Sequence, residues 1–193
     1  MKKLIILFLA IFILGTVSVS AEGKIVSKDK DWNTYTDETI GLSIDLPKYL
    51  NSNLLGNNDP WRSTIFLEQT MYPIFRPIIT VNIHIHTPVE YLPPSLNDCT
   101  DEEIISLKNH LQKFFSDLLK NPNSVESTDI KTNGQRAIMF TTQITINDQL
   151  VDMKILYIIF NKQLVGIAIT SFPENKEAVK TVEQIQNSIR FSK

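Results

Sequence analysis

The chain has 193 residues, of which 42% are hydrophobic, with 19 basic and 21 acidic side chains and a net charge of −2. This length fits one ordinary domain that buries its core without cross-links, and the single cysteine, Cys99, excludes an intramolecular disulfide. The mildly acidic charge argues against a nucleic-acid partner, because such binding relies on clustered Lys and Arg.

The first 21 residues have the pattern of a secretory signal peptide. Lys2 and Lys3 precede an unbroken apolar run over residues 4–14, and small side chains lead up to Ala21. Because this run is shorter than the roughly 20 apolar residues of a spanning helix, we predict cleavage after Ala21 and a mature form without a membrane span. The protein is then exported to a periplasm or to the extracellular medium. Cleavage removes two basic residues and no acidic one, so the net charge moves from −2 to −4.

The mature chain is predicted to begin with a flexible lead-in at residues 22–33, which is polar and without periodicity, followed by a single domain over residues 34–193. Alternating apolar and polar residues predict strands. This alternation occurs at 41–47, where Pro47 ends it, and again at 79–86. Between these strands the sequence predicts a short helical turn at 48–55, a turn at 57–60 and an extended stretch at 62–71.

The clearest helix start is the capping box Thr100-Asp101-Glu102-Glu103, which follows a proline-containing loop at 87–98. The hydroxyl of Thr100 is placed to accept from the third backbone N–H while Glu103 reaches back to the cap. Apolar residues then recur by threes and fours until Asn121-Pro122 ends the helix. The predicted buried residues are Ile104, Leu107, Leu111, Phe114 or Phe115, and Leu118.

Residues 125–172 are predicted to form four consecutive antiparallel strands. Asn133-Gly134 is a strong hairpin signal because both positions tolerate positive φ, and 147–148 and 161–162 mark the next two turns. Apolar residues at helical spacing then predict a second amphipathic helix. They are Ala178, Val182, Ile185 and Ile189. The fold class is therefore α+β, an antiparallel sheet of about six to seven strands with helices packed on it.

Three features of the chain resemble the PsbP-like superfamily. They are the opening from Tyr35 to Pro47 with its Gly-x-x-x-x-x-Pro spacing from Gly41, the long meander with an Asn-Gly hairpin, and the closing helix that ends in Ser188-Ile189-Arg190-Phe191. The superfamily includes the extrinsic PsbP subunit of photosystem II, a Ran-binding nuclear transport factor and many small exported bacterial proteins. The resemblance implies a PsbP-like sheet and favours a role in binding or assembly, although a fold alone does not fix a function.

His84 and His86 are the sharpest candidate metal ligands. In the strand at 79–86, alternation places Ile79, Val81, Ile83 and Ile85 on a core face, and Thr80, Asn82, His84 and His86 on a face expected to be wet. Two imidazoles on one face suit Zn²⁺ or Cu²⁺. A third ligand has to come from elsewhere, with His110, Cys99, Asp98 and Glu90 as the options. The competing interpretation is an amphipathic strand whose histidines are solvated or covered by a helix.

Cys99 precedes the predicted helix, where the helix dipole lowers a thiol pKa. The acidic residues around it, Asp98, Asp101, Glu102 and Glu103, act in the opposite direction. We therefore expect an inert or partly buried thiol rather than a nucleophile.

No catalytic motif stands out in this sequence. Serine nucleophile elbows, Walker loops and dinucleotide-binding glycine patterns are absent from it. The prolines and aromatic residues between Tyr72 and Pro94 predict either a binding surface, with Tyr72, Phe75 and Tyr91 as contacts, or a loop folded over the sheet edge. No catalytic or cofactor-binding residue is predicted.

The leading hypothesis is an exported, non-catalytic binding or assembly module of the cell envelope or secretome, with an unidentified protein partner. The alternatives are a metal-binding protein that uses His84 and His86, and a small hydrolase with an unrecognised site. The hydrolase alternative predicts a deep polar cleft with at least one strongly shifted titratable group.

Overall fold

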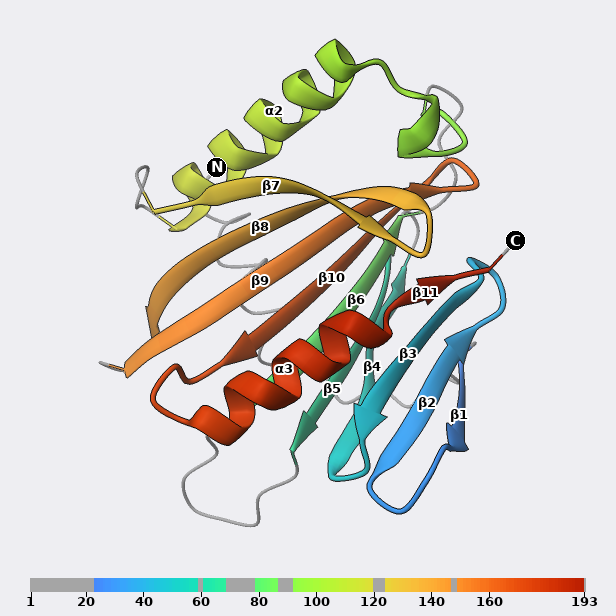
Figure 1. Cartoon of the computed structure of the whole chain (residues 1–193), viewed down its shortest axis with the longest axis vertical. Helices are drawn as coiled ribbons and strands as arrows, with labels where there is room; N and C mark the ends of the chain where they lie inside the picture. The colour runs from blue at the N-terminus through green and yellow to red at the C-terminus, as the bar shows by residue number, and fades with distance from the viewer. Residues whose placement is uncertain are drawn as a thin grey trace.

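Two antiparallel sheets form the centre of the protein (Figure 1). The computed structural model describes residues 23–58, 61–68, 79–86, 92–119, 124–146 and 149–192. The smaller sheet has the order β1-β2-β3-β11, from β1 (Lys24–Ser27), β2 (Trp32–Asp37), β3 (Leu42–Pro47) and β11 (Arg190–Phe191). The larger sheet has the order β4-β5-β6-β10-β9-β8-β7, from β4 (Leu50–Asn58), β5 (Trp61–Glu68), β6 (Ile79–His86), β7 (Glu126–Thr132), β8 (Gln135–Ile146), β9 (Gln149–Phe160) and β10 (Gln163–Ser171). The helices in the described part of the chain are η1 (Leu96–Asp98), α2 (Asp101–Leu119) and α3 (Lys176–Ser188).

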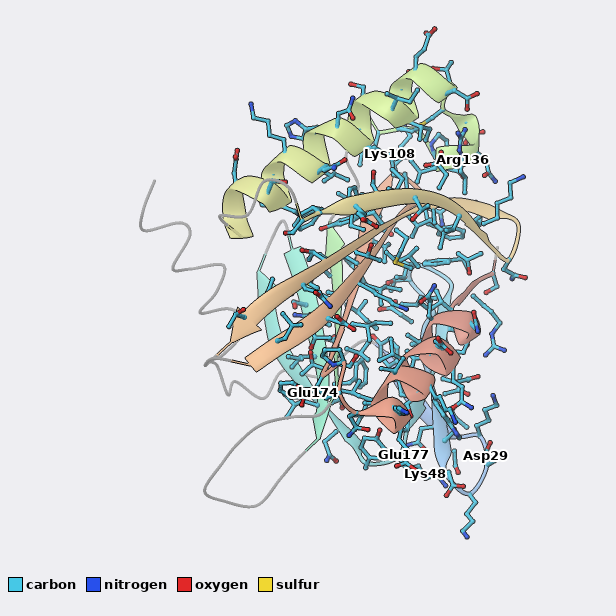
Figure 2. All side chains as sticks on the ribbon, turned by 60° about the vertical axis from the view of Figure 1, so that its left-hand side comes forward. Asp29, Lys48, Lys108, Arg136, Glu174 and Glu177 are labelled. Atoms are coloured by element: carbon cyan, nitrogen blue, oxygen red, sulfur yellow. The ribbon has the colours of Figure 1, made fainter. Side chains whose placement is uncertain are left out.

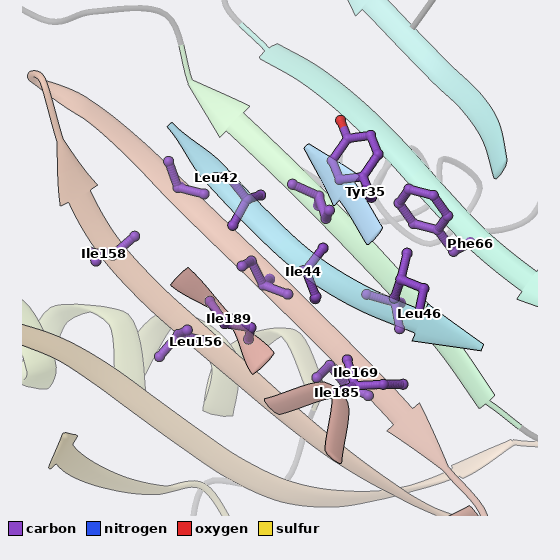
Figure 3. Close-up of a cluster of buried hydrophobic side chains, with 14 of the residues drawn as sticks. Tyr35, Leu42, Ile44, Leu46, Phe66, Leu156, Ile158, Ile169, Ile185 and Ile189 are labelled. Carbon is purple, nitrogen blue, oxygen red and sulfur yellow. The ribbon is translucent and has the colours of Figure 1, made fainter. Parts of the chain in front are cut away.

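The main core lies between the smaller sheet with α3 and one face of the larger sheet (Figure 3). Alternation along β3 directs Leu42, Ile44 and Leu46 into this core, where all three are buried. The larger sheet contributes Ile83, Ile167 and Leu156 among others, and α3 contributes Ala178, Val182 and Ile185. Three of the four apolar residues predicted for the closing helix therefore form its buried face, and the fourth, Ile189, is buried just after the helix ends.

The second core lies on the other face of the larger sheet, beneath α2. Ile104 and Phe115 of α2 pack with Phe140 and Ile155. Phe115 is the buried residue of the aromatic pair, while Phe114 is exposed. The predicted capping box is confirmed: the N–H of Glu103 donates to Thr100 Oγ1 at 3.3 Å, and the N–H of Thr100 donates to Glu103 Oε2 at 2.8 Å.

The meander predicted for residues 125–172 is confirmed as β7, β8, β9 and β10, each paired with the next. Asn133 and Gly134 have φ values of 49° and 80°, as the hairpin signal requires, and Asn161 and Lys162 have 52° and 62°. The turn expected at 147–148 lies outside the described residues. Because β9 lies between β8 and β10, its apolar residues are covered on both faces, with Ile158 in one core and Ile155 in the other.

Two predictions before β5 were wrong. The helical turn expected at 48–55 is part of strand β4, whose pairing with β5 shifts register between Leu54 and Gly56. A bulge inserts an extra residue, and this hides the two-residue period that identifies a strand. The lead-in expected at 22–33 contains β1 and the start of β2. All four residues of β1 are exposed at the sheet edge, so no buried residues mark the strand in the sequence.

The closing segment also differs from the prediction, because the last helix ends at Ser188 and Arg190–Phe191 form β11 beside β3. The single sheet of about six to seven strands that the sequence predicts is instead two sheets, one of seven strands and one of four, and the strand predicted at 41–47 belongs to the smaller sheet as β3. A two-residue strand is too short to show periodicity, so its partner strand β3 defines it.

A buried carboxylate ties the two ends of the chain together. Asp45 of β3 is 3% exposed and accepts from Lys28 Nζ at 2.6 Å and Thr34 Oγ1 at 2.7 Å. Arg190 of β11 lies 3.3 Å from the same carboxylate. Burial alone would raise the pKa of Asp45, but the bonds from Lys28 and Thr34 and the charge of Arg190 outweigh burial, so the pKa is lowered.

Replacing this carboxylate with the Asp45→Asn substitution is expected to lower the free energy of unfolding by about 2 kcal/mol, because hydrogen bonds to charged groups are lost. A lowered folded pKa means that the stabilisation is present above the ordinary pKa of 3.8 and is lost as the pH falls through the folded pKa. Urea unfolding of both proteins at neutral and acidic pH measures the difference. A difference that stays constant down to pH values below 3.8 would contradict this role.

Candidate functional site

An open depression of about 650 Å³ lies beside the β7–β8 hairpin. It is formed where η1, the edge strand β7 and the start of β8 meet. Its lining residues are Asn97, Asp129, Ile130, Lys131, Gly134 and Arg136. The lining is mostly polar or charged, which suits contact with another polar surface better than enclosure of an apolar ligand.

Hydrogen bonds between the hairpin and η1 fix the wall of this depression. Asn97 Nδ2 donates to the carbonyl of Gly134 at 3.2 Å, and the N–H of Arg136 donates to Asn97 Oδ1 at 2.8 Å. Ser95 Oγ donates to Gln135 Oε1 at 3.0 Å. The polar groups are therefore held in place without a partner, which lowers the entropy cost of binding.

Charged side chains alternate along the floor of the depression. Arg136 Nη2 lies 2.7 Å from Asp101 Oδ1 and 3.9 Å from Asp129 Oδ2, and Lys108 Nζ lies 3.1 Å from Asp129 Oδ1. Figure 2 shows Lys108 and Arg136 together beside the start of α2, at the opposite end of the molecule from Glu177. Lys131 is exposed and forms no ion pair with any described residue. The depression therefore presents one cation that its own carboxylates do not neutralise.

A second polar group lies inside the protein, on the α2 side of the larger sheet. We call it the β6 polar strip and define it as Thr80, Asn82 and His84 of β6 with Ser63 of β5. The register pairs Ser63 with His84 directly across the two strands. Ser63 Oγ donates to Asn82 Oδ1 at 3.1 Å, and the hydroxyls of Thr80 and Thr170 share a hydrogen bond.

This face of β6 was expected to be wet, and that prediction was wrong. Asn82 is only 1% exposed, and Thr80 and His84 are half-buried. The amide nitrogen of Asn82 has no hydrogen-bond partner among the described residues. A buried donor without a partner costs about 1–3 kcal/mol. Alternation alone shows that a face is polar, but not whether another segment covers it.

Burial shifts the pKa of two titratable groups here, His84 in the strip and Tyr157 beside it. Burial lowers the pKa of His84 to about 4 and raises the pKa of Tyr157 to about 12. Gly166 of β10 lies between them in the register. The Tyr157 ring lies over Gly166, since a Cβ added there would come within 3.1 Å of Tyr157 Cε1. Both side chains are therefore uncharged at neutral pH.

The predicted metal pair is only partly described. His84 lies in the strip, whereas the side chain of His86 lies outside the described residues, as does Glu90. Among the side chains that are described, no three His, Cys, Asp or Glu residues come together in a group that could hold a metal ion. The metal site at His84 and His86 stays a prediction, which metal analysis of the parent protein beside a His84→Ala/His86→Ala variant would test.

Cys99 has the environment that the sequence indicates. The thiol is half-buried and donates to the carbonyl of Ser95 at 3.9 Å. Burial raises its pKa, and the charges of Glu103 and Asp98 add to this effect, so the reactive thiolate is disfavoured. The predicted contact residues Tyr72, Phe75 and Tyr91 lie outside the described residues.

Ser63 and His84 are the described pair that most resembles a hydrolytic dyad. The hydroxyl of Ser63 donates to Asn82, however, and a pKa of about 4 makes His84 a weak base. This arrangement does not activate Ser63 as a nucleophile.

Sequence reasoning missed the depression and the unpartnered amide. The Asn-Gly signal located the hairpin, but contacts from Asn97 and Asp101 come from a different element. Asn82 was placed on the correct face, and only its burial was unforeseen.

In the part of the chain that the structure describes, no helix is long and apolar enough to cross a membrane. A scan against protein-family models finds no match, and a search of curated proteins finds none either.

A search of solved structures finds chains that are similar to this one. The solution structure of cyanobacterial PsbP (CyanoP) from Synechocystis matches 93% of this chain and 99% of that chain, with a TM-score of 0.57 and 10% identity. A protein from Bacteroides thetaiotaomicron has a TM-score of 0.46 and 10% identity, over 79% of this chain and 46% of that chain. PA94 of Pseudomonas aeruginosa, a protein of unknown function, has a TM-score of 0.44 and 12% identity, over 85% of this chain and 99% of that chain. The CyanoP match carries the conclusion: the chain has a PsbP-like fold.

Proposed function

We propose that the chain is an exported, non-catalytic binding module that assembles with another protein of the cell envelope or secretome. The depression beside the β7–β8 hairpin is the surface that binds the partner. The observation that carries this proposal is a rigid, open, charged surface with one unneutralised cation, Lys131.

The chemistry of the depression favours a partner that presents an acidic side chain. Arg136 is already paired with Asp101, and Asp129 is already paired with Lys108. Lys131 is therefore the positive charge that remains available to pair with a carboxylate of the partner. Ile130 also lines the depression, but its side chain packs against the main core on the other face of the sheet.

Two further observations support a binding role. The fold is shared with CyanoP across nearly its full length, and the sequence pattern resembles a superfamily whose members include an assembly subunit. The signal peptide predicted at residues 1–21 supports export. Fold likeness at 10% identity does not transfer an activity, so the proposal rests on the surface itself.

Photo-crosslinking tests the proposal. The exported protein is produced in its own organism with a photoreactive amino acid in place of Asp98, and in a second strain in place of Glu177. Asp98 is exposed in η1 next to the lining residue Asn97, so Lys131 stays intact for the partner. We expect one discrete crosslinked species from position 98 and none from position 177, because Glu177 is exposed at the opposite end of the molecule.

Competition identifies specific binding at the depression. Added unlabelled parent protein is expected to remove the crosslinked species, and the Lys131→Glu protein is expected to compete at least about tenfold less well, since like charges now meet. The same ladder of products from both positions, or equal competition by both proteins, would show that the depression is not the partner surface.

A further inference from the structure

The edge of the larger sheet beside the depression is open. β7 is the last strand of this sheet and pairs with β8 on one side only (Figure 1). An edge strand presents a row of backbone N–H and C=O groups with which another strand can pair. The exposed residues of β7 are Glu126, Thr128, Asp129 and Lys131.

The two-residue turn of the β7–β8 hairpin determines which backbone groups of β7 point outwards. Thr132 and Gln135 flank this turn, and in such hairpins the flanking pair exchanges both of its backbone hydrogen bonds. The next pair, Lys131 and Arg136, therefore exchanges none. The N–H of Arg136 agrees with this assignment, because it donates to Asn97 on η1 instead.

The outward backbone groups of β7 belong to every second residue, because the register continues from the turn without a shift. They are those of Ser127, Asp129 and Lys131. These N–H and C=O groups form no backbone hydrogen bond with another described residue. The side chains of the same residues lie on the α2 face, where Asp129 pairs with Lys108. A strand that pairs with this edge therefore places alternate side chains at the depression.

The charges along this edge select the strand that fits. A lysine on an edge strand discourages indiscriminate pairing, because it brings an unpaired charge into the new ladder. Lys131 holds this position and forms no ion pair with any described residue. Asp129 is already paired with Lys108 and lies 3.9 Å from Arg136. An added strand therefore needs a carboxylate opposite Lys131, and it needs no charge opposite Asp129.

We infer that the partner binds as an extended segment that pairs with the edge of β7 and places an Asp or Glu side chain opposite Lys131. Backbone hydrogen bonds supply the binding, and the carboxylate supplies the selectivity. This inference rests on the proposed function and specifies it, because it defines the conformation of the bound segment and the strand that it contacts. A partner that only fills the depression would contact the α2 face of β7 and leave the backbone edge free.

Photo-crosslinking from both faces of β7 tests the inference in the exported protein. One strain carries the photoreactive amino acid at Asp98, beside the depression, and a second strain carries it at Thr128. Thr128 is exposed and lies on the opposite face of β7, since its partner in the register, Met139, belongs to the main core. A strand along the edge passes both positions, so we expect the same partner to be captured from each. Capture from position 98 alone would overturn strand addition and leave the proposed binding surface standing.

Proline substitution tests the backbone hydrogen bonds directly. Proline has no N–H, and sheets accept it on an edge strand where that N–H faces solvent. Ser127→Pro, in the chain with the photoreactive group at position 98, is therefore expected to fold and to yield at least about tenfold less crosslinked partner. Ser127→Ala loses only the hydroxyl bond to Gln112 and is expected to retain the crosslinked product.

Ser27→Pro is the matched control on the edge strand of the smaller sheet. The N–H of Lys28 donates to the carbonyl of Trp32, towards β2, so the N–H of the exposed residue Ser27 points outwards. This substitution is expected to leave capture from position 98 unchanged. Melting temperatures of the purified variants show whether they fold. If Ser127→Pro does not fold, the comparison of positions 98 and 128 in the parent chain decides the question.

Three further results would overturn the inference. The first is equal capture by the parent chain and a folded Ser127→Pro variant, since the partner then does not use the backbone edge. The second is an equal loss of capture in Ser27→Pro and Ser127→Pro. The third is a crosslinked product made of two copies of this chain, which would mean that the edge pairs with itself. No captured partner from either position would contradict the proposed function, and the inference with it.

Discussion

Lowering the pH from 7 to 4 is expected to destabilise the folded protein by about 3 kcal/mol through His84 alone. Burial lowers the pKa of His84 to about 4 in the folded state, against 6.5 for an ordinary histidine. Between these two values the unfolded chain binds a proton that the folded chain does not. The stabilisation is therefore complete above pH 6.5 and is lost as the pH falls towards 4.

Comparison of wild type with His84→Gln isolates this effect from the carboxylates that also titrate in acid. The difference in free energy of unfolding between the two proteins, measured in urea at several pH values, is expected to change by about 3 kcal/mol over this range. His110 is exposed on α2, so His110→Gln serves as the control and is expected to follow wild type. Parallel curves for wild type and His84→Gln would contradict the burial of His84.

The Gly41→Ala substitution is expected to lower the free energy of unfolding by about 3 kcal/mol. Gly41 has a φ of 61°, a left-handed conformation that costs alanine about 1–2 kcal/mol. A Cβ at this position would also lie 2.0 Å from the backbone oxygen of Ser192. The substitution therefore pushes the chain end away from β3 and breaks the bond from Ser192 N–H to the Gly41 carbonyl, now 2.9 Å long.

Gly134→Ala is the matched control for this experiment. Gly134 has a φ of 80°, and nothing lies within 4 Å of an added Cβ, so only the conformational cost of about 1–2 kcal/mol applies. Thermal and urea unfolding of both variants measure the two costs. Equal destabilisation by the two substitutions would show that the contact with Ser192 does not restrain the C-terminal strand.

The sequence predicts those elements that are determined by interactions between residues close together in the chain. Thr100 and Glu103 form their capping box wherever the helix packs, and Asn133-Gly134 turns the chain by its own backbone preference. The buried faces of β3 and α3 follow from periodicity for the same reason. The PsbP-like fold was recognised from these elements together, and the CyanoP match confirms it.

The missed features depend on contacts between distant segments. The bulge in β4 is defined by its pairing with β5, and β11 exists only because β3 offers an edge. Likewise, the polar side of β6 is the same in sequence whether water or protein covers it, so the burial of Asn82 could not be predicted. The depression joins η1 to a hairpin almost forty positions later, as in the bond between Asn97 and Arg136.

Crosslinking from position 98 of the exported protein, compared with position 177, tests the proposed binding function most directly. The account predicts a single partner captured at position 98 alone, displaced by the parent protein and poorly displaced by Lys131→Glu. No crosslinked partner at position 98, or the same products from both positions, would contradict a binding module that uses this surface.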